Sequence, residues 1–218
     1  MDLNELTNYV VEGKVVQAES FTVEALAEGM EPSDILNNGL IPGMDIVGDK
    51  FQSREYFMPE MLVSAKAMKQ AMIHIKPLLA KSKEKAELTA ICGTVVGDLH
   101  DIGVSLVAMM LEGAGFEVVL LGSDNTADEF LSAMEKHEAQ VLCLSALLTT
   151  TINGMATVID RAKELEVRGK MKIYVGGAPV TDQFSDEIGA DGFKPDAASA
   201  VKMIKEDMIT LQKNKSDD

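Results

Sequence analysis

The chain has 218 residues, of which 46% are hydrophobic and 25% charged, as is typical of a soluble globular protein with one large domain or two small ones. Its formal net charge of −15 argues against nucleic acid and anionic membrane surfaces as partners, because both would repel it. No segment resembles a signal peptide or has the roughly 18 apolar residues of a membrane span, so we expect a cytoplasmic protein. The two cysteines, Cys92 and Cys143, lie in apolar runs and are expected to be buried.

Residues 1–86 have the apolar spacing of helices throughout. Apolar residues recur every three or four positions in four segments, which predicts a small helical bundle: residues 3–13, 20–29, 31–56 and 57–81. Gly13 and Gly29 suit helix ends, and Pro32 suits a helix start.

Four methionines lie near one face of the last helical segment: Met58, Met61, Met68 and Met72. We interpret this stripe either as part of the core or as a flexible apolar surface against something that moves.

The pattern changes after the polar stretch at residues 82–89, which we expect to link a domain at 1–86 to a second domain at 87–218. Five short apolar runs follow that are typical of strands: residues 88–96, 116–122, 141–148, 171–177 and 190–194. Helical patterns begin near residues 102, 126, 152, 182 and 196. This alternation predicts an α/β fold, a doubly wound five-stranded parallel sheet of flavodoxin-like order preceded by the helical bundle.

Polar residues and glycines gather where the first, third and fourth predicted strands end. Asp98 and His100 follow the first strand, and Ser145 ends the third. The other members of this group are small or hydroxylated: Gly103, Thr149, Thr150, Thr151, Gly176 and Gly177. Ligands of a doubly wound sheet bind at the carboxyl ends of its strands, so we expect one site here, where glycines let a large group approach the backbone.

Three common functions of this fold match the pattern poorly. A dinucleotide-binding turn needs G-x-G-x-x-G, whereas an acid and a histidine stand between Gly97 and Gly103 and would meet a pyrophosphate with negative charge. A phosphate-accepting receiver domain needs an aspartate where Ser145 stands, although Lys194-Pro195 suits that interpretation. A catalytic serine has a histidine and an acid nearby but lacks the G-x-S-x-G elbow.

The remaining hypothesis makes His100 a metal ligand that is oriented by Asp98, because ligating histidines usually give their second ring proton to a carboxylate. One histidine cannot build a zinc site, which takes three or four protein ligands. A lone imidazole makes sense as a ligand only where a macrocycle supplies the other donors. His74 and His137 lie in helical patterns and are expected to be structural.

Taken together, these residues resemble the corrinoid-binding signature, D-x-H-x-x-G followed by S-x-L and G-G. Its positions here are Asp98, His100, Gly103, Ser145, Leu147, Gly176 and Gly177. Three longer stretches resemble the corrinoid proteins of methylotrophic methyltransferase systems: LIPGMDIVGDKFQSREYFMPEMLVSA, SALLTTTINGM and YVGGAPVTDQFSDEIGADGFKPDAASAV. Those systems act on methylamines, methanol or quaternary amines such as glycine betaine.

The resemblance implies that a cobalamin or related corrinoid binds with its own lower base displaced and Nε2 of His100 on cobalt. Asp98 and Ser145 would form a relay with His100, and the helical domain would cap the reactive face. The residues in contact with the cofactor would be Asp98, His100, Asp101, Ile102, Gly103, Ser145, Leu147, Thr149, Gly176 and Gly177.

The resemblance also implies a methyl carrier that is one component of an enzyme system. A substrate-specific methyltransferase would load the cobalt from a methylamine, a quaternary amine or methanol. A second methyltransferase would pass the methyl group to coenzyme M or tetrahydrofolate, and a reductive activator would be a further partner. Two other interpretations stay open: a cobalamin-binding sensor or regulatory module without turnover, and the cobalamin domain of a mutase, although this chain holds no barrel for radical chemistry.

Overall fold

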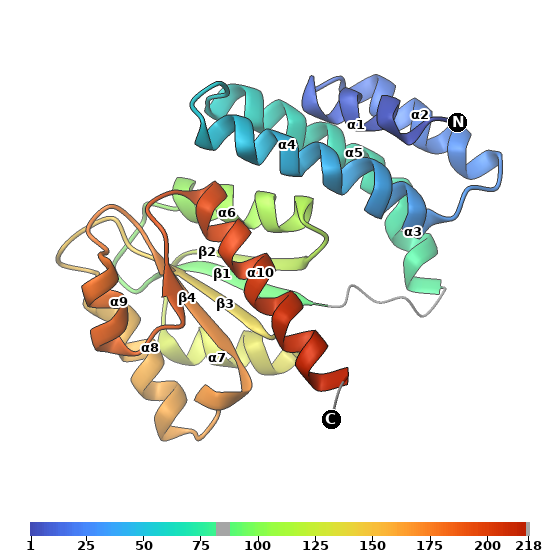
Figure 1. The fold of residues 1–218 in the computed structure, drawn as a ribbon. Helices are drawn as coiled ribbons and strands as arrows, with labels where there is room; N and C mark the ends of the chain where they lie inside the picture. Colours follow the sequence, from blue (N-terminus) through green and yellow to red (C-terminus); the bar gives the residue numbers. More distant parts are fainter. Residues whose placement is uncertain (82–87, 217–218) are drawn as a thin grey trace. The chain divides into compact units, whose positions relative to one another are not determined.

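Figure 1 shows the computed structural model, which describes residues 1–81 and 88–216. The chain divides into two compact units. The helical unit comprises Met1–Glu87 with Glu112–Phe116, and the sheet unit comprises Leu88–Leu111 with Glu117–Asp218. Most of the expected linker, residues 82–87, lies outside the described residues. Within the described ranges, we find no helix with both the length and the apolar character needed to cross a bilayer.

The helical unit contains α1 (Leu3–Val11), α2 (Val15–Ala27), α3 (Pro32–Ile35), α4 (Ile41–Gln52) and α5 (Met58–Lys81). Gly13 and Gly29 follow α1 and α2 with φ angles of 65° and 87°, the left-handed conformation that glycine adopts without strain. Pro32 stands in the first turn of α3. The expected helix ends and start are therefore confirmed.

The segment expected as one helix over residues 31–56 contains a π-helical turn, η1 (Leu36–Leu40), between α3 and α4. The N–H of Ile41 donates to the carbonyl of Leu36, five residues back, and the next residue is Pro42, which has no N–H to donate. The wider turn therefore lies where proline interrupts the ordinary hydrogen-bond pattern of the helix.

The core of the helical unit forms where α2 packs against α5 and α1 against α4. Met61 and Met68 are buried in it, Met72 is partly buried and Met58 is exposed. The core interpretation of the methionine stripe is confirmed for Met61 and Met68.

The sheet unit contains five parallel strands in the order β2-β1-β3-β4-β5, which confirms the expected flavodoxin-like sheet. The strands are β1 (Thr89–Val95), β2 (Glu117–Asn125), β3 (Val141–Ser145), β4 (Lys172–Gly176) and β5 (Gly192–Phe193). The third strand ends at Ser145 rather than at residue 148, because the N–H groups of Leu147 and Leu148 leave the ladder to donate to the carboxylate of Asp98.

The helices of this unit are α6 (Ile102–Gly113), α7 (Ala127–Lys136), α8 (Asn153–Glu164), α9 (Asp182–Ile188) and α10 (Ala197–Ser216), with a short 3₁₀ turn, η2 (Arg168–Lys170). Figure 1 shows α7 and α8 on one side of the sheet and α10 on the other. The buried residues between the sheet and α7 and α8 include Ile91, Leu142, Phe130 and Met155. The hydroxyl of Tyr174 in β4 donates to Asp207 in α10 over 2.9 Å. Cys92 and Cys143 are buried as expected.

The parallel register brings the carboxyl ends of three central strands to the same level. Ser145 in β3 pairs with Thr94 in β1 on one side and with Gly176 in β4 on the other. The strand order reverses between β1 and β3, so the loops after these two strands meet at the switch point where such sheets bind ligands.

Candidate functional site

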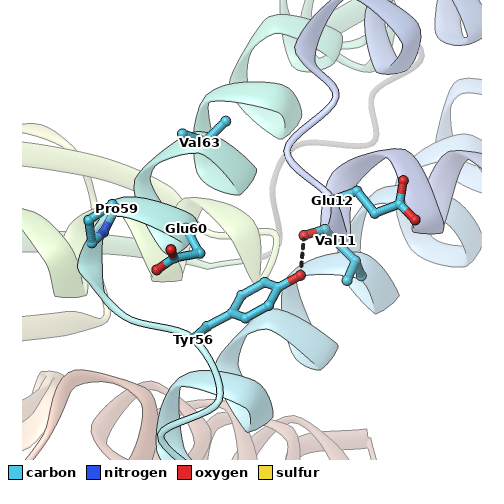
Figure 2. Close-up of a pocket in the computed structure, with 6 residues that line it drawn as sticks. All are labelled: Val11, Glu12, Tyr56, Pro59, Glu60 and Val63. Carbon is cyan, nitrogen blue, oxygen red and sulfur yellow. Dashed lines mark hydrogen bonds between the residues drawn. The ribbon is translucent and has the colours of Figure 1, made fainter.

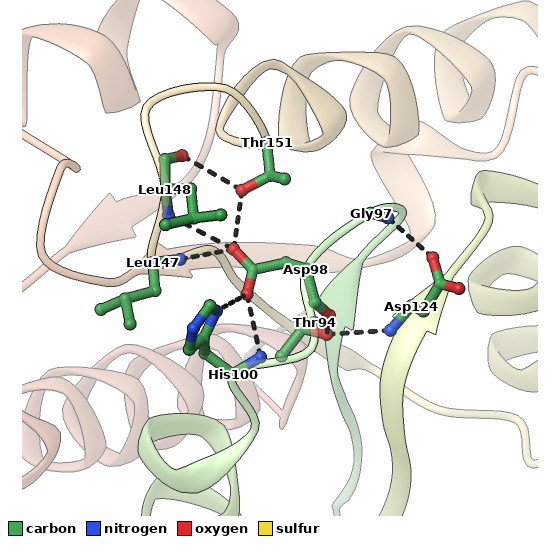
Figure 3. Close-up of polar contacts among 8 residues, drawn as sticks. All are labelled: Thr94, Gly97, Asp98, His100, Asp124, Leu147, Leu148 and Thr151. Carbon is green, nitrogen blue, oxygen red and sulfur yellow. Dashed lines mark hydrogen bonds and ion pairs between the residues drawn. The ribbon is translucent and has the colours of Figure 1, made fainter.

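A tight turn after β1 begins the site. The N–H of Asp98 donates to the carbonyl of Val95 over 3.0 Å, and Gly97 between them has a φ angle of 81°. A type II turn requires such a positive φ at its third residue, which is why glycine stands there. The turn reverses the chain at the end of the strand and directs the side chain of Asp98 toward the loop after β3 (Figure 3).

The carboxylate of Asp98 is completely buried and accepts five hydrogen bonds (Figure 3). Its Oδ1 accepts from the backbone N–H of His100 at 3.0 Å and from Nδ1 of the same histidine at 2.9 Å. Its Oδ2 accepts from the N–H of Leu147 at 2.7 Å, the N–H of Leu148 at 3.3 Å and the hydroxyl of Thr151 at 2.6 Å. A buried charge is tolerable only with this degree of hydrogen bonding.

Two opposing effects set the pKa of Asp98. Burial raises it, but the hydrogen bonds from Thr151, His100 and Leu147 outweigh burial and hold the pKa well below its usual range. The side chain is therefore an acceptor-only carboxylate, so the proton in its contact with His100 resides on Nδ1. In the neutral imidazole this leaves the lone pair on Nε2.

His100 stands at the surface within an apolar region. Its side chain is 50% exposed, and its Nε2 has no hydrogen-bond partner among the described residues. Exposed hydrophobic side chains lie in the surrounding loops and at the start of α6: Val96, Leu99, Ile102, Leu147 and Leu148. A single nitrogen donor within an apolar surface suits a flat ligand that brings its own metal. In the described ranges no three His, Cys, Asp or Glu side chains gather as a metal site of the protein's own.

The predicted glycines differ in the space around them. A Cβ added at Gly103 or Gly176 would have no atom within 4 Å, so both positions border open space. At Gly177, which has a φ of 124°, a Cβ would lie 1.8 Å from the carbonyl oxygen of Ala146. Gly177 is thus required by the fold, whereas Gly103 and Gly176 leave room for a ligand.

The remaining predicted residues lie on the strands and loops around His100 and at the start of α6. Ser145 is half-buried at the end of β3, Asp101 and Ile102 are exposed where α6 starts, and Thr149 is exposed in the loop after β3. The structure brings Asp98, His100 and Leu147 into direct contact by hydrogen bonds.

The expected relay of Asp98 and Ser145 with His100 stays a prediction, and the structure places a different hydroxyl beside Asp98. In the part of the chain that the structure describes, Ser145 makes no hydrogen bond to Asp98, and Thr151 occupies that place. Of the three consecutive threonines, only Thr149 was expected to contact the cofactor, and no sequence pattern singles out Thr151 as the partner of Asp98. Only the path of the loop, which returns to Asp98 just before α8, selects Thr151.

The other two histidines have structural positions, as expected. Nε2 of His74 in α5 lies 2.9 Å from Oε1 of Glu19 in α2, and His137 caps the carboxyl end of α7. The helical unit also has a surface pocket lined by Val11, Glu12, Tyr56, Pro59, Glu60 and Val63 (Figure 2). Its polar groups are engaged in the fold: the hydroxyl of Tyr56 donates to the carbonyl of Val11, and Glu60 accepts the N–H of Phe57.

Comparisons with known proteins agree over both units. Two family models, each described as a B12 binding domain, match residues 2–76 and 88–202. Over 203 residues the chain is 42% identical to monomethylamine corrinoid protein 2 of Methanosarcina acetivorans, covering 91% of this chain and 94% of the relative. Over 190 residues it is 40% identical to trimethylamine corrinoid protein 2 of the same organism, covering 86% and 88%.

A solved structure extends this similarity to the fold. A chain in the crystal structure of the methanol:cobalamin methyltransferase complex MtaBC from Methanosarcina barkeri is 28% identical to this one. The two superpose with a TM-score of 0.82 over 92% of this chain and 77% of that one.

Proposed function

Because this chain belongs to the family of corrinoid proteins of methylamine and methanol methyltransferase systems, we propose that it carries a methyl group on a cobalamin or related corrinoid bound by its sheet unit. One observation carries this proposal. Nδ1 of His100 is fixed by a buried carboxylate, which leaves Nε2 as the one ring nitrogen available to a ligand at an apolar surface.

The residues at the site fit a corrinoid. Nε2 of His100 is the proposed axial ligand of cobalt, with the lower base of the corrinoid displaced. The space beside Gly103 and Gly176 is the proposed path of the displaced nucleotide tail, because neither position carries a side chain to fill it. Further proposed contacts come from the ends of the strands and the loops that follow: Asp101, Ile102, Ser145, Leu147, Thr149 and Gly177.

When bound, the corrinoid supplies the cobalt centre on which a methyl group is carried between methyltransferases. The protein supplies the orientation of the ligand. Asp98 keeps the proton on Nδ1 and fixes the ring plane, which leaves the lone pair of Nε2 for the ligand. The N–H groups of Leu147 and Leu148 and the hydroxyl of Thr151 keep Asp98 charged, although it is buried.

The exposed apolar side chains near His100 have a second role in this proposal. Leu99, Ile102 and Leu147 would be covered by the bound cofactor and would keep water from the histidine. The proposed role of the helical unit is to cover the reactive face of the cofactor. Met58 and its neighbour Phe57 are exposed on that unit and are candidates for the contact.

The proposed partner that loads the methyl group is a substrate-specific methyltransferase. The similar chain from Methanosarcina barkeri was solved in a methyltransferase complex, which supports this part of the proposal. The relatives that are 42% and 40% identical are named for monomethylamine and trimethylamine, so a methylamine is the proposed donor in preference to methanol or glycine betaine. A second methyltransferase for coenzyme M or tetrahydrofolate and a reductive activator are proposed from the family resemblance alone.

Reconstitution tests the proposal. Purified apoprotein is incubated with hydroxocobalamin, passed through gel filtration and examined by absorption spectroscopy, alongside His100→Ala and the control His137→Ala, which changes an exposed histidine at the end of α7. We expect wild type and His137→Ala to retain corrinoid with the same histidine-ligated spectrum, which His100→Ala loses. Failure of the wild type to retain corrinoid under either oxidising or reducing conditions would contradict the proposal.

A further inference from the structure

The turn that carries Asp98 is held from its other side by a residue outside the corrinoid-binding motif. Asp124 stands at the carboxyl end of β2, and its Oδ1 accepts the N–H of Gly97 over 2.7 Å (Figure 3). We infer that Asp124 is a positioning residue for His100, which it aligns through the backbone of the 95–98 turn. This inference rests on the proposed function of His100 as the cobalt ligand.

Asp124 contacts the turn at two points. While its carboxylate accepts from Gly97, its own backbone N–H donates to the carbonyl of Asp98 at 3.1 Å and to the hydroxyl of Thr94 at 3.0 Å. The hydroxyl of Thr94 donates in turn to the same carbonyl of Asp98. The end of β2 thus fixes both the middle of the turn and its last residue.

Asp98 is consequently held from two directions. Its backbone carbonyl is bound by Asp124 and Thr94, and its carboxylate is bound by the loop after β3. Since the imidazole of His100 takes its orientation from Oδ1 of Asp98, a displacement of the turn would displace the ring. Histidine ligation depends on ring orientation. The hydrogen bonds between Asp124 and the turn are therefore expected to strengthen cobalt binding by His100.

The backbone conformation of Asp124 restricts which residue types fit at this position. Its φ angle of 61° lies in the left-handed region, where aspartate, asparagine and glycine are accommodated more readily than other residues. The contacts to Gly97 and Asp98 both depend on this conformation, because it presents the N–H and the carboxylate to the same turn.

Two substitutions separate the hydrogen bond from the backbone conformation. Asp124→Asn keeps an acceptor oxygen and tolerates the left-handed conformation, whereas Asp124→Gly keeps only the conformation. Amide hydrogen exchange of Gly97 is measured in the apoprotein, with Ile173 in the core of the sheet as the internal reference. We expect Gly97 to exchange about tenfold faster in Asp124→Gly, as the loss of one charge-assisted hydrogen bond implies. We expect little change in Asp124→Asn or at Ile173.

The second measurement is the fraction of bound corrinoid that shows histidine ligation after reconstitution with hydroxocobalamin, normalised to the corrinoid retained. A role in fold stability alone would lower retention without changing this fraction. We expect the fraction to fall severalfold in Asp124→Gly and to recover in Asp124→Asn. Should Asp124→Gly fail to fold, Thr94→Val tests the backbone part of the same arrangement, because it removes the hydroxyl that bridges the N–H of Asp124 and the carbonyl of Asp98.

His100→Ala is measured in parallel to separate two failures. Suppose that His100→Ala loses the histidine signature as expected. The role of Asp124 would then be overturned if the histidine-ligated fraction in Asp124→Gly equalled that of wild type, or if Asp124→Gly and Asp124→Asn lost it equally. A wild-type signature in His100→Ala would overturn the proposed function and this inference with it.

Discussion

Oδ1 of Asp98 lies 2.9 Å from Nδ1 of His100, in a contact between a completely buried carboxylate and a half-exposed imidazole. The carboxylate is held by donors from a separate loop and cannot rotate with the ring. The ring therefore takes its orientation and its tautomer from the protein, and its other nitrogen is directed to the ligand side before any cofactor arrives. In the proposed complex, such prior orientation would lower the entropic cost of ligation by His100.

Asp98→Asn should destabilise the apoprotein, because an amide has one acceptor oxygen where the carboxylate uses two. Whichever way the amide turns, its NH₂ group faces N–H or hydroxyl donors of His100 or of Leu147 and Thr151. We expect a loss of about 2 kcal/mol or more in the free energy of unfolding, measured by urea denaturation. Asp186→Asn, an exposed acid on α9, is the control and should change little. Equal stability of Asp98→Asn and wild type would contradict the burial of this charge.

The hydroxyl bound to Asp98 belongs to Thr151, and a pair of substitutions tests this assignment. Thr151→Val keeps the shape of the side chain but removes the donor, at an expected cost of about 1 to 2 kcal/mol in the free energy of unfolding. Ser145→Ala should cost the apoprotein less than Thr151→Val, since Ser145 gives no hydrogen bond to Asp98 in the described residues. The reverse order of the two losses would assign the contact to Ser145.

Gly176 and Gly177 are adjacent, and the same substitution should affect them differently. Gly177→Ala would place a methyl group 1.8 Å from the carbonyl oxygen of Ala146, so we expect a strongly lowered melting temperature. Gly176→Ala meets no atom within 4 Å and should melt close to the wild type, yet retain less corrinoid after gel filtration if the nucleotide tail passes there. Full retention of corrinoid by Gly176→Ala would show that the nucleotide tail does not pass this position.

The buried hydroxyl of Tyr174 should make the folded protein less stable in alkali. Burial first, then the hydrogen bond to Asp207, raise its pKa far above the ordinary value of 10. A group with a raised pKa contributes its stabilisation below the unfolded pKa and loses it as the pH rises, because the unfolded chain releases the proton first. Above about pH 10 the free energy of unfolding should therefore fall by up to about 1.4 kcal/mol per pH unit from this group. Urea denaturation should show a shallower decline for Tyr174→Phe, and identical slopes would contradict the assignment.

The sequence was sufficient for the architecture because its periodicities are strong and local. Strands such as Val141–Ser145 are buried apolar runs, and their alternation with helices permits few folds. The π-helical turn before Pro42 and the early end of β3 were not predicted. The first depends on a missing donor inside a regular pattern, and the second on backbone groups that bind the distant Asp98.

The site was predictable to the extent that its residues are neighbours in sequence. Asp98 and His100 share one loop, so their spacing alone suggested the contact that the structure shows. Asp124 reaches the turn from the end of β2 through the register of the sheet, and Thr151 reaches Asp98 through the path of the loop after β3. The left-handed conformation of Asp124 has no sequence signal beyond the tolerance of aspartate for it.

Electron paramagnetic resonance of the reconstituted, singly reduced protein reports on the proposed bond between Nε2 of His100 and cobalt. Protein labelled with ¹⁵N only at histidine is compared with unlabelled protein and with labelled His100→Ala. We expect a nitrogen triplet in the superhyperfine splitting of the unlabelled protein that becomes a doublet on labelling and is absent from His100→Ala. A splitting that labelling leaves unchanged would show that the nitrogen belongs to the corrinoid's own base and that His100 is not the cobalt ligand.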